Sequence, residues 1–240
     1  SWVRLWMRNI NTINMIRKVL IANRGEIAVR VMRSCREMGI RSVAVFSEAD
    51  RTARHVLYAD EAVLIGPTAS KDSYLNIEKI IRAAKQHKVD AIHPGYGFLS
   101  ENADFARRCK EEGIVFIGPS AETMEAMGDK ISARKRMIDA GVPVVPGTQQ
   151  PLQDVGEACR VCREIGFPVM LKASMGGGGK GMRLIHKEEE VEEAYNAARS
   201  ESLSSFGDDT VYLEKYVEGP HHIEFQILGD NYGNVVHLSL

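Results

Sequence analysis

The chain has 240 residues, of which 44% are hydrophobic and 26% charged, a composition typical of folded globular proteins. Its 31 basic and 32 acidic side chains leave a formal net charge of -1, which argues against a protein that binds nucleic acid. No apolar run approaches the roughly 20 residues that span a bilayer, which argues against a membrane protein. The four cysteines are too few for a disulfide framework, so we expect a reducing compartment, the cytoplasm.

The first fourteen residues differ in composition from the rest of the chain. Residues 1–14 contain arginines and two tryptophans but no acidic residue, and Met15 is a good alternative start. We expect this stretch to be a leader or a non-native extension that lies outside the fold.

Residues 15–128 alternate short apolar runs with amphipathic segments. Apolar runs predict strands at 18–22, 42–46, 89–92 and 114–117, and helical spacing predicts helices at 27–39, 77–87 and 103–112. This alternation predicts βαβ units on a parallel sheet, whose ligands bind at the carboxyl ends of the strands. The first turn has only Gly25 where a dinucleotide-binding protein has three glycines, which disfavours NAD binding.

A second region begins near residue 129. A helix is predicted at 130–140, and a connection rich in Pro and Gly leads to a second helix that ends at Gly166. Further along, strands are predicted at 168–173, 182–185, 210–216, 222–228 and 235–240, with a charged helix at 188–200.

A glycine run between two predicted strands is the strongest signal for a ligand. Residues 176–181 contain five glycines in six positions, and Lys172 ends the strand before them. Glycines allow backbone N–H groups to surround phosphates, and a lysine adds a positive charge. The run is not a Walker A loop, because a strand follows it instead of Ser or Thr and a helix. We expect a glycine flap on a hairpin rather than a flexible linker.

Two other segments are candidate ligand contacts. The strand that ends in Glu214 and Lys215 is able to offer backbone groups to a purine edge, although the two side chains also fit a plain surface ion pair. The loop His93–Asn102 follows a strand and holds two glycines, which permit close approach of a ligand to the backbone.

Two further patterns have ordinary explanations. Cys159 and Cys162 form a single C-x-x-C within a predicted helix, which favours buried packing over a redox or zinc site. His221 and His222 are adjacent on a predicted strand, so they point to opposite faces and do not share a metal ion.

The span from Met15 to about Leu238 resembles biotin carboxylase, the ATP-grasp component of acetyl-CoA, propionyl-CoA and pyruvate carboxylases. The resemblance rests on six segments in the family's order: Lys18–Ala28, His93–Asn102, Phe116–Pro119, Met127–Lys130, Lys172–Ser174 with its glycine run, and Glu214–Tyr216. It implies an α/β chain with a Rossmann-like parallel-sheet N-terminal domain followed by an incomplete ATP-grasp fold. The expected divisions are 1–14, 15–128, 129–217 with the glycine-rich lid, and 218–240 as the start of the next subdomain.

The resemblance also implies site residues and partners. ATP contacts are expected from Lys130, Lys172, Gly178, Gly179, Glu214, Lys215, Tyr216, Val217 and His222, and biotin is expected near Tyr96 and Gly97. The implied reaction uses ATP, Mg2+ and bicarbonate to form carboxyphosphate and then carboxylates biotin on a carrier protein. Implied partners are the biotin carboxyl carrier protein, a carboxyltransferase and a second copy in a homodimer. As the biotin carboxylase of acetyl-CoA carboxylase, the protein would act in fatty acid biosynthesis.

The chain departs from the family after Leu238. The family's catalytic residues, and the acidic Mg2+ ligands among them, are expected beyond Leu240, so no metal ligand is expected within the chain and the chain alone is expected to be inactive. Two alternatives stay open. One is another ATP-grasp ligase of the carbamoyl-phosphate synthetase type, and the other is a non-catalytic, nucleotide-binding truncated subunit.

Overall fold

The computed structural model describes residues 16–128, 130–174, 181–230 and 232–238. The chain divides into an N-terminal unit, residues 1–128, and a C-terminal unit, residues 129–240. Each unit has its own hydrophobic core. None of the helices in the described part of the chain has the length and apolar character needed to cross a bilayer.

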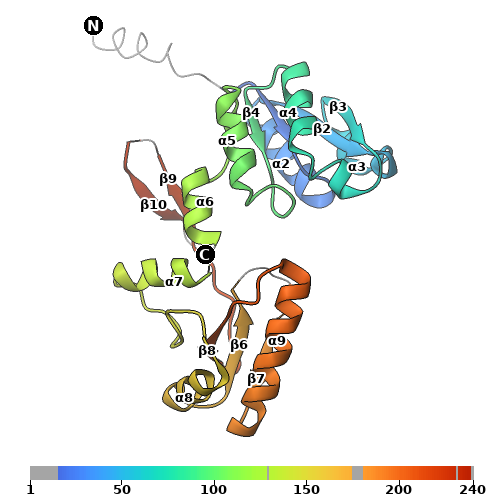
Figure 1. The fold of residues 1–240 in the computed structure, drawn as a ribbon. Helices are drawn as coiled ribbons and strands as arrows, with labels where there is room; N and C mark the ends of the chain where they lie inside the picture. The colour runs from blue at the N-terminus through green and yellow to red at the C-terminus, as the bar shows by residue number, and fades with distance from the viewer. Residues whose placement is uncertain (1–15, 129, 175–180, 231, 239–240) are drawn as a thin grey trace, which may run out of the picture. The chain divides into compact units, whose positions relative to one another are not determined.

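The N-terminal unit is a five-stranded parallel sheet with the strand order β3-β2-β1-β4-β5 (Figure 1). Its strands are β1 (Lys18–Ile21), β2 (Arg41–Ser47), β3 (Glu61–Gly66), β4 (Ala91–His93) and β5 (Val115–Phe116). Its helices are α2 (Gly25–Glu37), α3 (Arg54–Tyr58), α4 (Ile77–Gln86), α5 (Ala103–Glu111) and α6 (Ala121–Gly128), with short 3-10 turns η2 (Glu48–Asp50) and η3 (Ser70–Asp72). The predicted α/β fold with a parallel sheet is confirmed.

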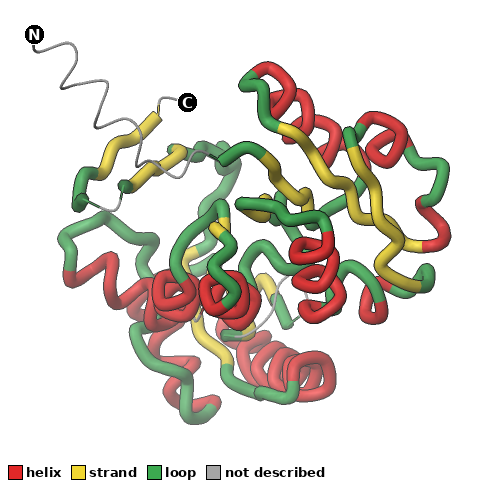
Figure 2. Tube along the Cα trace, turned by 90° about the horizontal axis from the view of Figure 1, so that it is seen from above, coloured by secondary structure: helices red, strands yellow, loops and turns green. Residues whose placement is uncertain are grey.

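Helices cover both faces of this sheet, as the tube view also shows (Figure 2). Side chains alternate between faces along each strand, so Leu20 and Val43 pack with α4 and α5, whereas Val19 and Ala44 pack with α2. The strand order reverses between β1 and β4: β2 and β3 are added on one side of β1, and β4 and β5 are added on the other side. Ligands of open α/β sheets bind at such a point, outside the carboxyl ends of the strands.

The sequence did not predict β3, α3 or α6. β3 is an edge strand whose side chains alternate between half-buried and exposed, so it lacks the continuous apolar run of the central strands. α3 has only five residues and α6 eight, too few for a helical period to stand out.

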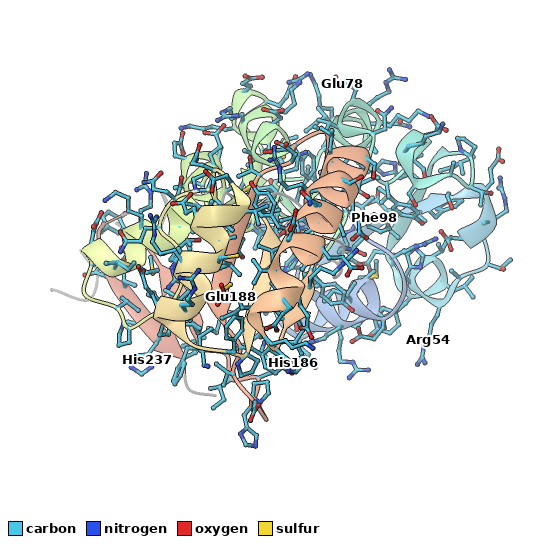
Figure 3. All side chains as sticks on the ribbon, turned by 60° about the horizontal axis from the view of Figure 1, so that its bottom comes forward. Arg54, Glu78, Phe98, His186, Glu188 and His237 are labelled. Atoms are coloured by element: carbon cyan, nitrogen blue, oxygen red, sulfur yellow. The ribbon has the colours of Figure 1, made fainter. Side chains whose placement is uncertain are left out.

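The C-terminal unit contains an antiparallel three-stranded sheet with the order β7-β6-β8. Its strands are β6 (Val169–Ala173), β7 (Arg183–Ile185) and β8 (Val211–Lys215), and its helices are α7 (Lys130–Asp139), α8 (Val155–Ile165) and α9 (Val191–Phe206), with the 3-10 turn η4 (Glu188–Glu190). α8 and α9 cover one face of the sheet, and η4, which includes the labelled Glu188, contacts both helices (Figure 3). The predicted hairpin around the glycine run is confirmed by the pairing of β6 with β7.

The last two strands form a separate hairpin of β9 (Gln226–Gly229) and β10 (Val235–Leu238), whose residues are all exposed. The predicted strand at 222–228 is therefore wrong in its first half, because residues 222–225 have no strand conformation. The register explains the difference: Gln226 pairs with Leu238, so residues before Gln226 would need partners beyond Leu238. Residues 239 and 240, the end of the predicted last strand, lie outside the described residues.

Candidate functional site

The loop that follows β4, residues 94–98 and here called the β4 loop, is fastened to the turn that follows β1. The Asn23 side-chain amide donates hydrogen bonds of 2.8 Å to the carbonyls of both Pro94 and Tyr96, and Asn23 itself is buried. Gly95 has a φ of +67°, and a Cβ at this position would come within 2.7 Å of Asn23 Nδ2. A glycine is therefore required both for the left-handed backbone and for the close approach of Asn23.

The β4 loop presents the two residues expected near biotin. Tyr96 is 61% exposed, and its hydroxyl donates a 3.2 Å hydrogen bond to the Glu26 carboxylate, which raises the pKa of the Tyr96 phenol. Gly97 has a φ of +68°, with open space where a Cβ would lie. The loop thus exposes an aromatic ring and a bare stretch of backbone at the carboxyl end of a central strand, as the position of the loop predicted.

A network of aromatic and charged side chains that the sequence did not predict supports this loop at Phe98, its last residue. The ring of Phe98 stacks on Tyr74 at 5.0 Å, and the Arg24 guanidinium lies over both rings. Arg24 also pairs with Asp50, which accepts a 2.7 Å hydrogen bond from the Tyr74 hydroxyl. Burial alone would raise the pKa of Asp50, but hydrogen bonds from Tyr74 and other neighbours lower it on balance.

In the C-terminal unit, the face of the sheet opposite α8 and α9 carries Lys172 and Glu214. The residues of β6 that alternate with Lys172 are buried against the helices. In the antiparallel register Lys172 lies opposite Tyr212, and Glu214 lies opposite Met170, so Lys172 and Glu214 are diagonal neighbours. We call these four residues the Lys172 face.

Lys172 and Glu214 form an ion pair. The distance from Lys172 Nζ to Glu214 Oε2 is 2.5 Å, and the two side chains are 27% and 20% exposed. The other carboxylate oxygen, Oε1, lies 3.8 Å from the Nη1 of Arg134 on α7. Arg134 was absent from the residues predicted from sequence, and its position beside Glu214 comes from tertiary packing that no local pattern signals.

The glycine run begins just beyond Lys172, and the backbone on both sides of it is fixed. The N–H of Ala173 donates to the carbonyl of Gly181, and the N–H of Ser174 donates to the carbonyl of Thr210. Gly178 and Gly179 lie outside the described residues, as does the rest of 175–180. The ammonium of Lys172, at the closed base of the hairpin, is a positive charge that suits a phosphate group.

At the end of β8, the Lys215 side chain and two backbone N–H groups are hydrogen-bonded within the fold. Lys215 points to the helix-covered side of the sheet, where its ammonium donates 2.9 Å hydrogen bonds to the carbonyls of Gly166 and Phe167 at the end of α8. The N–H groups of Lys215 and Tyr216 donate to Pro146 and Pro168. Val217, the last of the predicted nucleotide contacts in this segment, is 49% exposed.

The remaining predicted nucleotide contacts are Lys130 and His222. Lys130 is the first residue of α7, and the structure does not describe its side chain. His222 is exposed outside any strand and pairs with Glu224 at 2.9 Å. The predicted orientation of His221 and His222 on a strand is therefore wrong. Among the residues that the structure describes, no group of three or more acidic, His or Cys side chains is placed to hold a metal ion.

The predicted packing role of the C-x-x-C pair is confirmed. Cys162 is fully buried in the core of the C-terminal unit, and Cys159 packs against the same cluster. Both thiols are free, and burial raises the pKa of Cys162 to about 11. A protonated, buried thiol is a poor nucleophile and a poor metal ligand.

Comparison with protein families gives one match for each unit. Residues 15–124 match the biotin carboxylase N-terminal domain, and residues 129–239 match the ATP-binding domain of the carbamoyl-phosphate synthase L chain. Among curated relatives, the chain is 56% identical to Biotin carboxylase 1 of Bacillus subtilis, over 94% of this chain and 50% of the relative. It is also 56% identical to the biotin carboxylase of Allochromatium vinosum, again over 94% of this chain and 50% of the relative.

A solved structure also resembles the chain closely. It is the dimeric biotin carboxylase domain of 2-oxoglutarate carboxylase from Hydrogenobacter thermophilus, in complex with MgADP, ADP and bicarbonate, with a TM-score of 0.85 and 54% identity over 94% of this chain and 49% of that chain. The chain thus spans about half the length of these relatives. Over nearly all of its length the chain is therefore similar to the N-terminal half of biotin carboxylases, with a biotin carboxylase N-terminal domain followed by an ATP-binding domain.

Proposed function

We propose that this chain supplies the nucleotide-binding and biotin-facing half of a biotin carboxylase. The complete protein would use ATP to activate bicarbonate as carboxyphosphate and would then carboxylate biotin on a carrier protein. The observation that carries this proposal is the Lys172 face, where a lysine held by Glu214 stands at the base of a glycine-rich hairpin.

The charge at this position supports ATP binding. Lys172 lies at the end of β6 with its ammonium partly accessible, so it is placed to meet a phosphate that enters beside the hairpin. Gly178, Gly179 and Lys130 would add contacts to the phosphates, and the backbone from Glu214 to Val217 would hold the adenine. His222 is proposed as a further nucleotide contact. Positioning of the phosphates and neutralisation of their charge would supply most of the rate enhancement.

The biotin-facing part is the β4 loop. Its exposed tyrosine and the open backbone at Gly97 offer a flat apolar surface and peptide groups to a ring that itself bears an amide-like ureido group. Asn23 fixes the path of this loop through two hydrogen bonds, so the surface is organised before a ligand arrives.

Mg2+ would supply further positive charge on the phosphates when bound with ATP. The same proposal includes the partners and the pathway of the complete protein. Its partners would be a biotin carboxyl carrier protein, a carboxyltransferase and a second copy in a homodimer. As the biotin carboxylase of acetyl-CoA carboxylase, it would act in fatty acid biosynthesis. The proposed cytoplasmic location rests on the four free cysteines.

The alternative of a carbamoyl-phosphate synthetase type of ligase draws support from the match of residues 129–239. The match of residues 15–124 to a biotin carboxylase domain, and the β4 loop within it, favour biotin as the acceptor.

Titration calorimetry of ATP into the chain tests the nucleotide site. We expect saturable binding, and we expect Lys172→Ala to weaken the affinity about thirtyfold, because it removes a charge-assisted hydrogen bond. Lys187→Ala is the matched control, since Lys187 is an exposed lysine of the same unit. Its affinity should equal that of the unmodified chain.

Two results would contradict the proposal. One is the absence of ATP binding by a chain that is folded by circular dichroism, and the other is equal ATP affinity in the Lys172→Ala and Lys187→Ala variants.

A further inference from the structure

The side chain of Arg134 is largely covered by the fold but has few hydrogen-bond partners. Its side chain is 9% exposed, and a charged guanidinium at that depth is costly unless it is paired. Its Nη2 donates to the carbonyl of Val145, and its Nη1 lies 3.8 Å from Glu214, which is long for an ion pair. Among the described residues, no acceptor lies within hydrogen-bonding distance of its Nε. Arg134 is therefore held in place while part of its hydrogen-bonding capacity is unsatisfied.

Glu214 is shared unequally between two cations. Lys172 is in direct contact at 2.5 Å, whereas Arg134 stands back at 3.8 Å. The three side chains together carry one net positive charge, since two cations surround one carboxylate. In this structure the Glu214 carboxylate is therefore paired mainly with Lys172.

Binding of an anion to Lys172 would change which cation pairs with Glu214. When the ammonium turns to a phosphate, the Glu214 carboxylate, only 20% exposed, loses its main partner and would also repel the incoming negative charge. Arg134 is the cation already positioned to take over, because a small movement of Glu214 would bring it into contact with Nη1.

We propose that Arg134 is a positioning residue that holds the Glu214 carboxylate when Lys172 is engaged by the phosphates of a nucleotide. It acts through Glu214 and does not touch the ligand. This inference rests on the proposed function, because it takes Lys172 as the phosphate contact, and it goes further by naming the cation that pairs with Glu214 once Lys172 has turned to the phosphate.

The test compares affinities for ATP and for inorganic tripolyphosphate across a mutant cycle. Arg134→Met removes the charge but keeps the length of the side chain, and we expect it to weaken both ligands about tenfold, as loss of one charged partner typically does. Arg134→Lys should restore most of the affinity. Lys135→Met is the matched control, because Lys135 is the next residue of α7 and is 57% exposed, and it should have no effect.

The decisive comparison uses Glu214→Gln. Without the carboxylate no counter-charge is needed, so adding Arg134→Met to Glu214→Gln should change the affinity less than about threefold. An equal loss in both backgrounds would overturn the inference, because Arg134 would then act on the ligand directly. An unchanged affinity in Arg134→Met alone would overturn it as well.

These results separate the inference from the proposed function. If Lys172→Ala weakens binding and Arg134→Met does not, only the inference fails. If Lys172→Ala has no effect, or if the chain binds neither ligand, the proposed site and the inference fail together. Should Arg134→Met not fold by circular dichroism, Arg134→Gln, which keeps a donor for the Val145 carbonyl, takes its place in the cycle.

Discussion

The β4 loop and the Lys172 face are held by different forces. The β4 loop is fixed by neutral hydrogen bonds from a buried amide and by glycines in the left-handed region, and its backbone has no freedom to move without breaking them. The Lys172 face is held by charge: Lys172 and Arg134 on the neighbouring α7 share the Glu214 carboxylate. We therefore expect the first region to keep one shape, and in the second we expect a ligand to change which cation pairs with Glu214. Mutations in the first should therefore change stability, and mutations in the second should change ligand affinity.

The largest expected effect is at Gly95. Gly95→Ala should destabilise the N-terminal unit by about 3 kcal/mol, because a Cβ costs strain at positive φ and also displaces Asn23 from its two acceptors. Gly97→Ala is the matched control, with the same backbone region but open space, and should cost about 1 kcal/mol. Urea denaturation followed by circular dichroism measures both, and equal costs would show that the fit of Asn23 is unimportant.

The next effect is at Asn23 itself. Asn23→Ala should cost about 2 kcal/mol, since it leaves the carbonyls of Pro94 and Tyr96 without their donor. Asn23→Asp should be no better, because a carboxylate cannot donate to a carbonyl and would repel both. Stability of the Asp variant close to that of the unmodified chain would contradict this description of the β4 loop.

Asp50 gives a pH-dependent test in the same region. Its folded pKa is lower than the ordinary value of 3.8, so its stabilising contribution is present above that value and is lost as the pH falls through the lower folded pKa. Asp50→Asn should therefore cost about 1 to 2 kcal/mol at neutral pH, and the difference from the unmodified chain should shrink below about pH 4. A difference that stays constant down to pH 2 would mean that the charge of Asp50 is not involved.

The smallest effect is expected at Lys215. Lys215→Met should destabilise the C-terminal unit by about 1 kcal/mol, because it removes two hydrogen bonds at the end of α8. It should leave ATP affinity unchanged, since the ammonium lies on the helix-covered side of the sheet. A loss of affinity comparable to that of Lys172→Ala would show that the side chain of Lys215 reaches the nucleotide.

Much of the fold follows from local patterns in the sequence. The buried central strands and most of the longer helices were predicted within a few residues, because their apolar periods are long enough to be recognised, but α9 continues to Phe206, six residues beyond its predicted end. The edge strand β3 and the five-residue helix α3 were missed, since half-exposed or very short elements lack such a period. The strand at 222–228 was placed too early, because the start of β9 depends on the register with β10 and not on its own composition.

The site was predictable only in part. Lys172 and the glycine run stand out in the sequence because unusual residues lie close together along the chain. Arg134 lies far from Glu214 in sequence, and Asn23 lies 71 residues before the Pro94 carbonyl that it holds. Contacts of this kind are decided by packing, and only the structure identifies them.

The most direct measurement uses a fusion of residues 15–238 of this chain to the second half of Biotin carboxylase 1 of Bacillus subtilis. It follows the transfer of label from bicarbonate and the cleavage of ATP. We predict that ATP cleavage by the folded fusion depends on bicarbonate, is stimulated by free biotin, and transfers label to biotin. At ATP concentrations below saturation we also expect Lys172→Ala to reduce transfer about thirtyfold and Lys187→Ala to preserve it. A folded fusion that binds ATP but carries label only to ammonia, or whose activity is unchanged by Lys172→Ala, would contradict the proposed function.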